Sequence, residues 1–283
     1  MKYNPKIHNL RHVAKAIIGN IEFLFKNKKS NLIVLNYHGT PKKFLKKFED
    51  QIIFLKDHFE LIKAKEFYDI VSGRIIKPGP KILFTFDDGL KNNLNAVQIL
   101  EKHGISGFFF IVPSFINSNN QKKFYIENIR QEINENIDSE EEDFTPLSWK
   151  DIIEISKFHE IGSHTSTHTI SKETKDPFFI QNEIIGSKNE IETRIGKKIT
   201  SFCSINNTIQ STNKLSISKI EANYSYHFTT LPGNNEINLN PYFIKRCNVE
   251  SHWMLGAFKF SFSERNFKRY LSQINKYKKQ SYN

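Results

Sequence analysis

Cysteine is scarce in this chain of 283 residues, where it occurs only as Cys203 and Cys247. Two cysteines cannot build a disulfide framework, and without a Cys-x-x-Cys pair a zinc site made of cysteines is excluded. Both side chains are therefore predicted to be ordinary buried thiols.

Long apolar runs are missing as well. No stretch of about 18 apolar residues occurs, which excludes a transmembrane helix. Residues 1–29 lack the continuous apolar core and the small-residue cleavage site of a signal peptide. We therefore expect a cytoplasmic protein, with peripheral binding to the inner face of the membrane left open.

Negative charge is in the minority, and the formal net charge is +11. Such a balance is typical of proteins with an anionic partner, such as an acidic glycan, a nucleic acid or an anionic membrane surface. A lysine-rich surface that is simply well solvated explains it equally well. No interleaved basic and aromatic strand motif occurs, so no nucleic-acid partner is expected.

Apolar strand candidates alternate with helical segments along most of the chain. Residues 81–86 (KILFTF) and 107–112 (GFFFIV) are predicted to be buried strands, and residues 90–103 and 177–195 helices. A capping box at residues 148–151 predicts the start of a further helix, and residues 243–249 are a candidate short strand. This alternation favours a parallel sheet, and its repeats fit a barrel whose chemistry gathers where strands end. We expect one distorted TIM-like (β/α) barrel over residues 31–262.

Three segments depart from this alternation. Residues 1–30 have apolar residues at helical spacing and predict either a helix packed on the outside of the fold, which we favour, or an interfacial membrane helix. Residues 117–145 form a polar insertion, with a helix near 124–137 and an acidic loop at 138–143. Residues 263–283 predict a basic C-terminal helix.

Two neighbouring carboxylates follow the strand at residues 81–86, in the sequence Asp87-Asp88-Gly89. Gly89 allows the chain to turn there without steric cost. Adjacent carboxylates repel each other unless a cation or a division of roles offsets the repulsion. A turn or a helix cap would also explain an isolated Asp-Asp-Gly sequence.

The second polar feature is His164-Thr165-Ser166-Thr167-His168. Two histidines separated by three residues would lie on one side of a helical turn, so that both rings reach one ion. The neighbouring hydroxyls are expected to bind the second ring nitrogens. One aspartate and two histidines would make an open three-ligand metal site, and the other aspartate could take a proton from water.

These residues resemble the polysaccharide deacetylases, the NodB-homology family of carbohydrate esterases. Residues 85–89 are similar to the family's first motif and residues 164–168 to its second. The resemblance covers about residues 31–250. It also includes residues 102–110, 147–149 and 159–163, and the early Tyr37-His38 segment of one branch of the family.

The resemblance implies a distorted (β/α) barrel of the NodB-homology type and hydrolysis of an amide. Asp87 would be the general base, and Asp88, His164 and His168 would hold a divalent metal. Zinc is the first expectation, and sites with histidine and carboxylate ligands also accept cobalt, nickel or manganese.

Later segments depart from the family pattern. The third motif, an aromatic residue followed by proline and glycine, is replaced at residues 202–207, where the backbone N–H of Ser204 is the candidate oxyanion donor. The general acid is open between His38, which we prefer, and His252. Arg246, in contrast, resembles an arginine near the end of these sequences, and the resemblance implies that it either pairs with Asp87, keeps it ionised and orients it, or forms a structural salt bridge.

We therefore expect a deacetylase acting on an N-acetylated amino sugar of a polysaccharide, a lipopolysaccharide precursor or a lipid-linked glycan. A glycan or glycolipid is the expected partner, with anionic membrane as a second one. Two alternatives stay open: a carbohydrate-binding protein on a decayed deacetylase fold, and an amidase for a non-sugar amide.

Overall fold

The computed structural model describes residues 15, 17–20, 32–74, 79–130, 144–236 and 239–282. In this part of the chain the strands form one parallel sheet in the order β7-β6-β5-β4-β3-β1-β8, and β2 pairs with β3 beside this path. They are β1 (Leu32–Tyr37), β2 (Glu60–Leu61), β3 (Lys81–Phe86), β4 (Phe108–Ile111), β5 (Glu160–Ser163), β6 (Ser201–Cys203), β7 (Tyr226–Phe228) and β8 (Cys247–Asn248).

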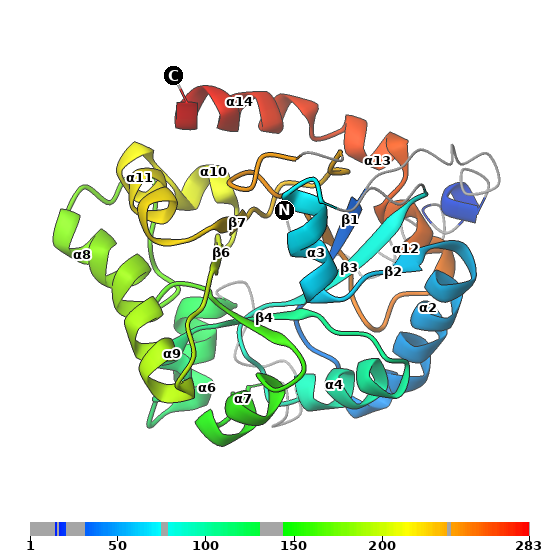
Figure 1. Cartoon of the computed structure of the whole chain (residues 1–283), viewed down its shortest axis with the longest axis horizontal. Helices are drawn as coiled ribbons and strands as arrows, with labels where there is room; N and C mark the ends of the chain where they lie inside the picture. Colours follow the sequence, from blue (N-terminus) through cyan, green and yellow to red (C-terminus); the bar gives the residue numbers. More distant parts are fainter. Residues whose placement is uncertain are drawn as a thin grey trace.

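Helices surround these strands in a ring (Figure 1), as expected for a (β/α) barrel. Along the chain they are η1 (Lys42–Phe44), α2 (Leu45–His58), α3 (Ala64–Val71), α4 (Asn93–Lys102), α5 (Pro113–Ile116), α6 (Gln121–Phe124), η2 (Tyr125–Ile129) and α7 (Trp149–Ile155). The second half contains α8 (Pro177–Gln181), η4 (Asn182–Gly186), α9 (Ser187–Ile195), α10 (Thr208–Ser211), α11 (Lys214–Asn223), α12 (Leu255–Ser261), α13 (Glu264–Lys268) and α14 (Leu271–Tyr282).

The segment that leads into β8 joins the two edges of the sheet. Ile244 forms a parallel bridge with Phe228 at the end of β7, and β8 then pairs with β1. The sheet is thereby closed into a distorted barrel, which confirms the predicted fold class.

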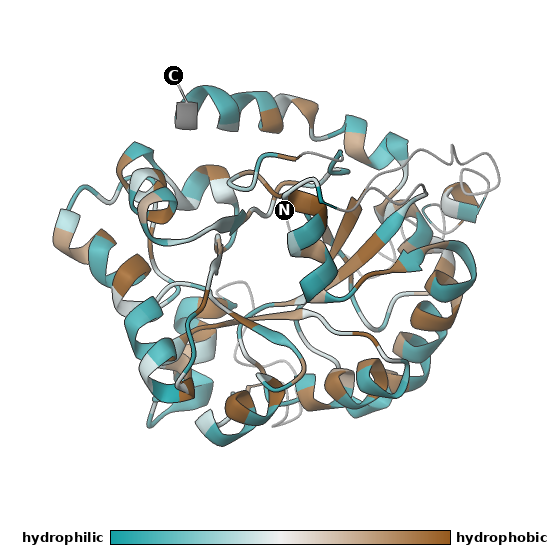
Figure 2. Ribbon diagram, in the orientation of Figure 1, coloured by the Kyte–Doolittle hydropathy of each residue, from teal (hydrophilic) through white to brown (hydrophobic). Residues whose placement is uncertain are grey.

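Alternate residues of each strand face opposite sides of the barrel wall. On β3, Phe84 and Phe86 face the surrounding helices, whereas Leu83 belongs to a separate cluster inside the barrel. Helix α3 closes one end of that interior, where the Phe67 ring lies 5.5 Å from Phe108 and 5.4 Å from Phe228. Figure 2 shows the outer helices with apolar faces toward the strands and polar faces outward.

Several predicted helices are confirmed. The capping box at Ser148 and Asp151 opens α7. Helix α8 continues through the π-helical segment η4 into α9, as one helical stretch that Gly196 ends with φ +69°. A glycine ends helices readily because this left-handed conformation costs it nothing.

Two predictions for the C-terminal part are wrong. The helix expected from residue 263 is divided into α13 and α14, because Phe267 packs on the main core whereas Tyr277 packs on a separate cluster beside Phe243. The strand expected at residues 243–249 is reduced to β8, because the Phe243 N–H closes a turn on the Asn240 carbonyl.

The described part of the N-terminal segment packs on α12. A Cβ atom on Gly19 would overlap the carbonyl oxygen of Gly256, so the two backbones are in contact. Lys259 also donates to the side chain of Asn20, at 3.1 Å. These contacts support the packed helix over the interfacial one.

Other predictions for the flanking segments are only partly covered. Most of residues 1–30 and the acidic loop at 138–143 lie outside the described residues. The insertion helix begins at Gln121, earlier than expected, and is described as far as Ile129. Within the described part of the chain, no helix is long and apolar enough to cross a membrane.

Candidate metal and catalytic site

The two neighbouring carboxylates lie where β3 ends. The N–H of Asp87 still donates to the Tyr37 carbonyl at 2.9 Å, so this residue continues the sheet. Asp88 (φ +72°) and Gly89 (φ +75°) then turn the chain in left-handed conformations. A non-glycine residue in this conformation is uncommon, and such residues cluster at functional sites. Both aspartates are 2% exposed and lie within 4 Å of the His164 ring.

Arg246 lies inside the barrel and holds Asp87 through two hydrogen bonds. Its Nη1 donates to Oδ1 at 2.7 Å and its Nη2 to Oδ2 at 2.8 Å. The guanidinium also donates to the Thr229 carbonyl and to the side chains of Asn36 and Thr85. The predicted pairing of Arg246 with Asp87 is therefore confirmed, and the arginine is fixed by neighbours on three strands or strand ends.

This pairing determines the charge state of Asp87. Burial alone would raise the pKa of its carboxyl, but the charge and hydrogen bonds of Arg246, together with His164, hold that pKa well below its usual range. Asp87 is therefore ionised at neutral pH, as a general base must be before it accepts a proton.

Asp88, His164 and His168 offer three donor atoms to one point. Asp88 Oδ1 lies 3.6 Å from Nε2 of His164 and 3.7 Å from Nε2 of His168. All three side chains are buried. Tetrahedral bonds of about 2.1 Å would separate ligand atoms by about 3.4 Å, so the donors are close to the spacing that a metal requires. The three residues predicted as metal ligands therefore lie together.

The second ring nitrogens show which nitrogen of each histidine is available. Nδ1 of His164 lies 3.1 Å from the Cys203 carbonyl, and Nδ1 of His168 lies 2.7 Å from the Asn128 carbonyl. A carbonyl can only accept, so each Nδ1 bears the proton and each Nε2 has a free lone pair. The prediction that neighbouring hydroxyls bind the second ring nitrogens is wrong, because backbone carbonyls of other segments occupy those positions.

The protonation of His164 and the second oxygen of Asp88 also suit a cation. Burial lowers the pKa of His164 to about 4, so its imidazole is neutral at pH 7. Among the described residues, Asp88 Oδ2 has no hydrogen-bond partner although it is buried. A buried carboxylate oxygen without a partner is costly, and a bound cation would remove that cost. The residues present therefore fit a divalent metal.

The loop that carries the two histidines is not the helical turn that their spacing predicted. Thr165 and His168 have φ values of +65° and +62°, and residues 164–170 contain no helix. The Thr165 hydroxyl accepts a hydrogen bond from the His168 N–H at 3.0 Å and closes the loop. The two rings still meet, with centroids 5.2 Å apart.

Glu183 is a residue of the site that the sequence analysis missed. It is fully buried and accepts hydrogen bonds from the N–H of Thr167 at 3.1 Å and from its hydroxyl at 2.8 Å. It lies in the π-helical segment η4, and such segments are frequent at functional sites. Its contacts anchor the loop one residue before His168.

The two candidates for the general acid lie in different surroundings. His38 follows β1 directly, and its Nδ1 is 3.8 Å from a carboxylate oxygen of Glu250. Strand β1 pairs with β3 so that Tyr37 lies opposite Phe86, and His38 and Asp87 therefore follow the same end of two neighbouring strands. His252 is exposed and packs against Phe44, with ring centroids 5.4 Å apart. The structure thus brings His38 to the Asp87 side of the site.

The structure contradicts the predicted oxyanion donor. The N–H of Ser204 donates to the Phe228 carbonyl at 2.9 Å and is therefore used inside the sheet. The Ser204 hydroxyl lies 2.6 Å from Nε2 of the buried His227. A strand contact of this kind could not be recognised from the altered third motif.

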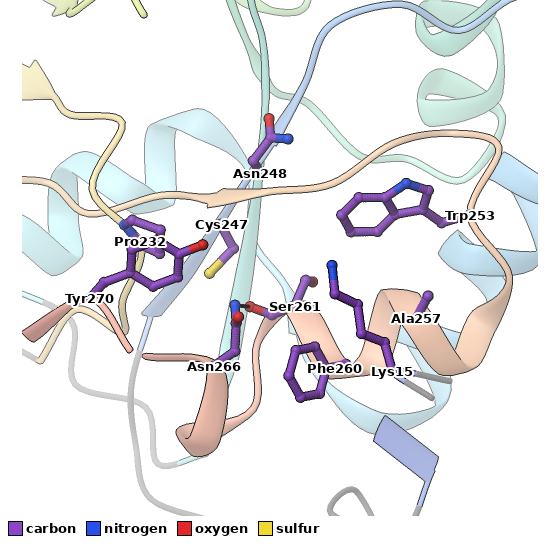
Figure 3. Close-up of a pocket in the computed structure, with 10 residues that line it drawn as sticks. All are labelled: Lys15, Pro232, Cys247, Asn248, Trp253, Ala257, Phe260, Ser261, Asn266 and Tyr270. Carbon is purple, nitrogen blue, oxygen red and sulfur yellow. Dashed lines mark hydrogen bonds between the residues drawn. The ribbon is translucent and has the colours of Figure 1, made fainter. Parts of the chain in front are cut away.

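A separate cavity of about 140 Å³ lies outside the barrel wall (Figure 3). It is lined by Cys247 of β8, by Trp253, by residues of α12 and α13 and by Lys15 of the N-terminal segment. None of the metal-site residues described above lines it. The second cysteine therefore lies on the far side of the wall from Asp87.

Solved structures with a similar fold include several deacetylases. BC0361, a polysaccharide deacetylase from Bacillus cereus, is 23% identical with a TM-score of 0.56, over 82% of this chain and 68% of that one. IcaB from Ammonifex degensii is 20% identical with a TM-score of 0.61, over 83% and 98%. The Streptococcus pyogenes deacetylase PplD, in complex with acetate, is 15% identical with a TM-score of 0.62, over 86% and 99%. At these identities the likeness shows the fold.

No protein of curated function matches the chain by sequence. The family model described as polysaccharide deacetylase matches residues 75–224, more than half of the chain. This range includes both aspartates after β3 and both histidines after β5. Together with the barrel and the site geometry, the match shows that the chain belongs to the polysaccharide deacetylase family.

Proposed function

We propose that this protein is a metal-dependent hydrolase that removes N-acetyl groups from amino sugars of a polysaccharide, a lipopolysaccharide precursor or a lipid-linked glycan. The observation that carries the proposal is the donor set of Asp88, His164 and His168 directly beside a carboxylate that Arg246 keeps ionised. An amide hydrolase needs both a site for a Lewis acid and a base within reach of the same water.

Each residue has a distinct task in the proposed reaction. A divalent cation held by Asp88, His164 and His168 would lower the pKa of a bound water toward about 7 and polarise the acyl carbonyl. Asp87 accepts the proton of the attacking water. Arg246 keeps Asp87 ionised and fixes the direction of its two oxygens. His38 donates a proton to the nitrogen of the departing sugar amine.

The metal would be zinc by default, with cobalt, nickel and manganese as alternatives to be compared. The test is to strip the protein with a chelator, add each metal in turn, and measure acetate release from a panel of N-acetylhexosamines and their oligomers. Asp88→Asn should lose the bound metal and the activity together. Asp87→Asn should keep the metal and lose turnover.

The same assay separates the two candidate acids and the alternatives. His38→Asn should lower kcat by about 10²–10⁴-fold, the usual contribution of a general acid. His252→Asn is the matched control and should keep its activity. Metal binding without acetate release from any N-acetylated sugar would instead support a carbohydrate-binding protein on this fold.

The net charge of +11 supports an anionic or membrane-linked substrate. Peripheral binding can be tested by sedimentation with liposomes that contain anionic lipid. Retention at low salt that is lost at high salt is the expected result, because surface charges are screened as ionic strength rises. Absence of retention at low salt would remove this part of the proposal.

A further inference from the structure

The altered third motif places a thiol beside the catalytic residues. Cys203 ends β6 and is fully buried. Its Sγ lies 3.8 Å from Oδ1 of Asp87, and its carbonyl accepts from the His164 ring. Neither the proton transfers nor the first donor set described above uses this sulfur.

Sγ of Cys203 completes a second group of donor atoms. Asp87, His164 and Cys203 each present one atom within 4.8 Å of the others, as Asp88, His164 and His168 do. In the second group, Nε2 of His164 lies 3.8 Å from Oδ2 of Asp87. Both groups thus contain the one lone pair of Nε2 of His164, so one cation cannot bind fully to both groups at once.

The two groups differ in chemical softness. The first offers a carboxylate and two imidazoles, which suit zinc, cobalt or manganese. The second replaces one imidazole by sulfur, and soft thiolate ligands select thiophilic metals. The distances of 3.8 Å from Asp87 to Cys203 and to His164 also suit a cation with longer bonds than zinc.

The local charges permit a cation in the second group. A divalent ion bound by the Asp87 carboxylate and a Cys203 thiolate forms a neutral unit. The remaining charges of Arg246 and Asp88 then compensate each other. Each oxygen of Asp87 has two lone pairs, so it can accept from Arg246 and still bind a cation. A buried site without net charge avoids the large cost of an isolated buried ion.

We propose that Asp87, His164 and Cys203 form a second metal site, which captures thiophilic divalent cations in competition with the first site. On binding, Cys203 forms a sulfur–metal bond and its thiol proton is released to solvent. Asp87 is then a ligand and cannot accept a proton from water. The protein loaded in this way is inactive as a hydrolase, a consequence that rests on the proposed function.

Cadmium is the probe for the binding part of this proposal. Chelator-stripped protein is titrated with Cd²⁺ while the ultraviolet charge-transfer absorption of the sulfur–cadmium bond is recorded. The band should grow and saturate at one equivalent in the wild type. Cys203→Ser should lose it, whereas Cys247→Ser should keep it, because Cys247 lies on the other side of the barrel wall. Persistence of the band in Cys203→Ser, or its absence in the wild type, overturns the proposal.

A variant of the first site distinguishes the two donor groups. His168→Gln removes a ligand of the first group only, so its cadmium band should remain at full height. Loss of the band in this variant would show that the sulfur binds only as part of the first site, against the proposal. Far-UV circular dichroism of each variant confirms that it is folded, and Cys203→Ala replaces Cys203→Ser if the hydroxyl prevents folding.

Inhibition is measured as the fraction of each variant's own metal-activated rate. The cadmium concentration for half inhibition should rise by at least about tenfold in Cys203→Ser and stay unchanged in Cys247→Ser, because loss of a supporting group already weakens metal affinity by 10–100-fold. An unchanged value in Cys203→Ser overturns the inhibitory role. A cadmium band in a protein without any deacetylase activity would defeat the proposed function while leaving the second site established.

Discussion

The buried pair of Asp87 and Arg246 allows a quantitative test of how the site is held together. Arg246→Met keeps much of the side-chain volume and removes the charge that compensates Asp87, whose side chain is 2% exposed. Breaking one partner of a buried ion pair costs about 3–5 kcal/mol, because the remaining charge has neither water nor a counter-ion. The total stability of a domain is about 5–15 kcal/mol. Without metal, this variant should therefore lose a large part of its free energy of unfolding.

The reverse substitution and the double variant complete a double-mutant cycle. Asp87→Leu leaves the guanidinium of Arg246 unpaired and should cost a similar amount. In the double variant no buried charge remains, and replacement of a whole ion pair by apolar residues is often nearly neutral. Its loss should be at least about 3 kcal/mol smaller than the sum of the two single losses.

The measurement is urea unfolding at pH 7, followed by far-UV circular dichroism in the presence of a chelator. The chelator is needed because a cation beside Asp88 would itself compensate the charge of Asp87. If neither single variant folds and the double variant does, the expected coupling is present in its strongest form. A loss below about 1 kcal/mol for Arg246→Met, or a double variant equal to the sum, would refute this reasoning.

Three further outcomes are expected. Glu183→Gln should weaken metal binding by about 10–100-fold in a competition titration, because the amide cannot accept both hydrogen bonds of Thr167 equally well. Unchanged metal affinity with a lowered melting temperature would show that Glu183 is purely structural. Burial lowers the pKa of His159 to about 4, below its unfolded value of about 6.5. The contribution of His159 to stability is therefore complete above pH 6.5 and is lost as the pH falls toward 4. His159→Asn should reduce this loss of unfolding free energy by about 3 kcal/mol, and parallel curves of stability against pH for the two proteins would contradict it. Gly162→Ala should lower the melting temperature and the metal affinity, because its Cβ would lie 2.5 Å from the Phe110 ring, beside the start of the loop that contains the two histidines. Wild-type values of both quantities would show instead that the Phe110 ring moves aside without cost.

The parts of the site that could be predicted are those whose residue types lie close together in sequence. Asp87 and Asp88 follow a strand with a clear apolar pattern, and the turn after it contains a glycine. His164 and His168 are four positions apart, so any compact turn brings the rings together. The predicted helical turn was wrong, yet the left-handed loop that replaces it produces the same convergence.

The supporting contacts could not be predicted, because they join segments far apart in the chain. Asn128 contributes a backbone carbonyl to the His168 ring across 40 positions, and a carbonyl has no sequence signature. Glu183 looks like any acidic residue of a helix until its burial is known. Ser204 lies next to Cys203 beside the site, but its N–H is bound to the Phe228 carbonyl, and this strand pairing could not be read from the sequence.

The ion pair with Arg246 limits the basicity of Asp87, and this limit has a consequence for the proposed reaction. A carboxylate whose pKa is held well below its usual range is a weak base, and an ordinary water would keep its proton against it. In the proposed reaction, a cation held by Asp88, His164 and His168 would therefore have to acidify the water. Arg246 makes Asp87 a poorer base, but it keeps the buried carboxylate ionised and fixes both of its oxygens, so its contribution is charge state and orientation rather than basicity. This predicts that a variant with a freer Asp87 would gain basicity and still lose rate.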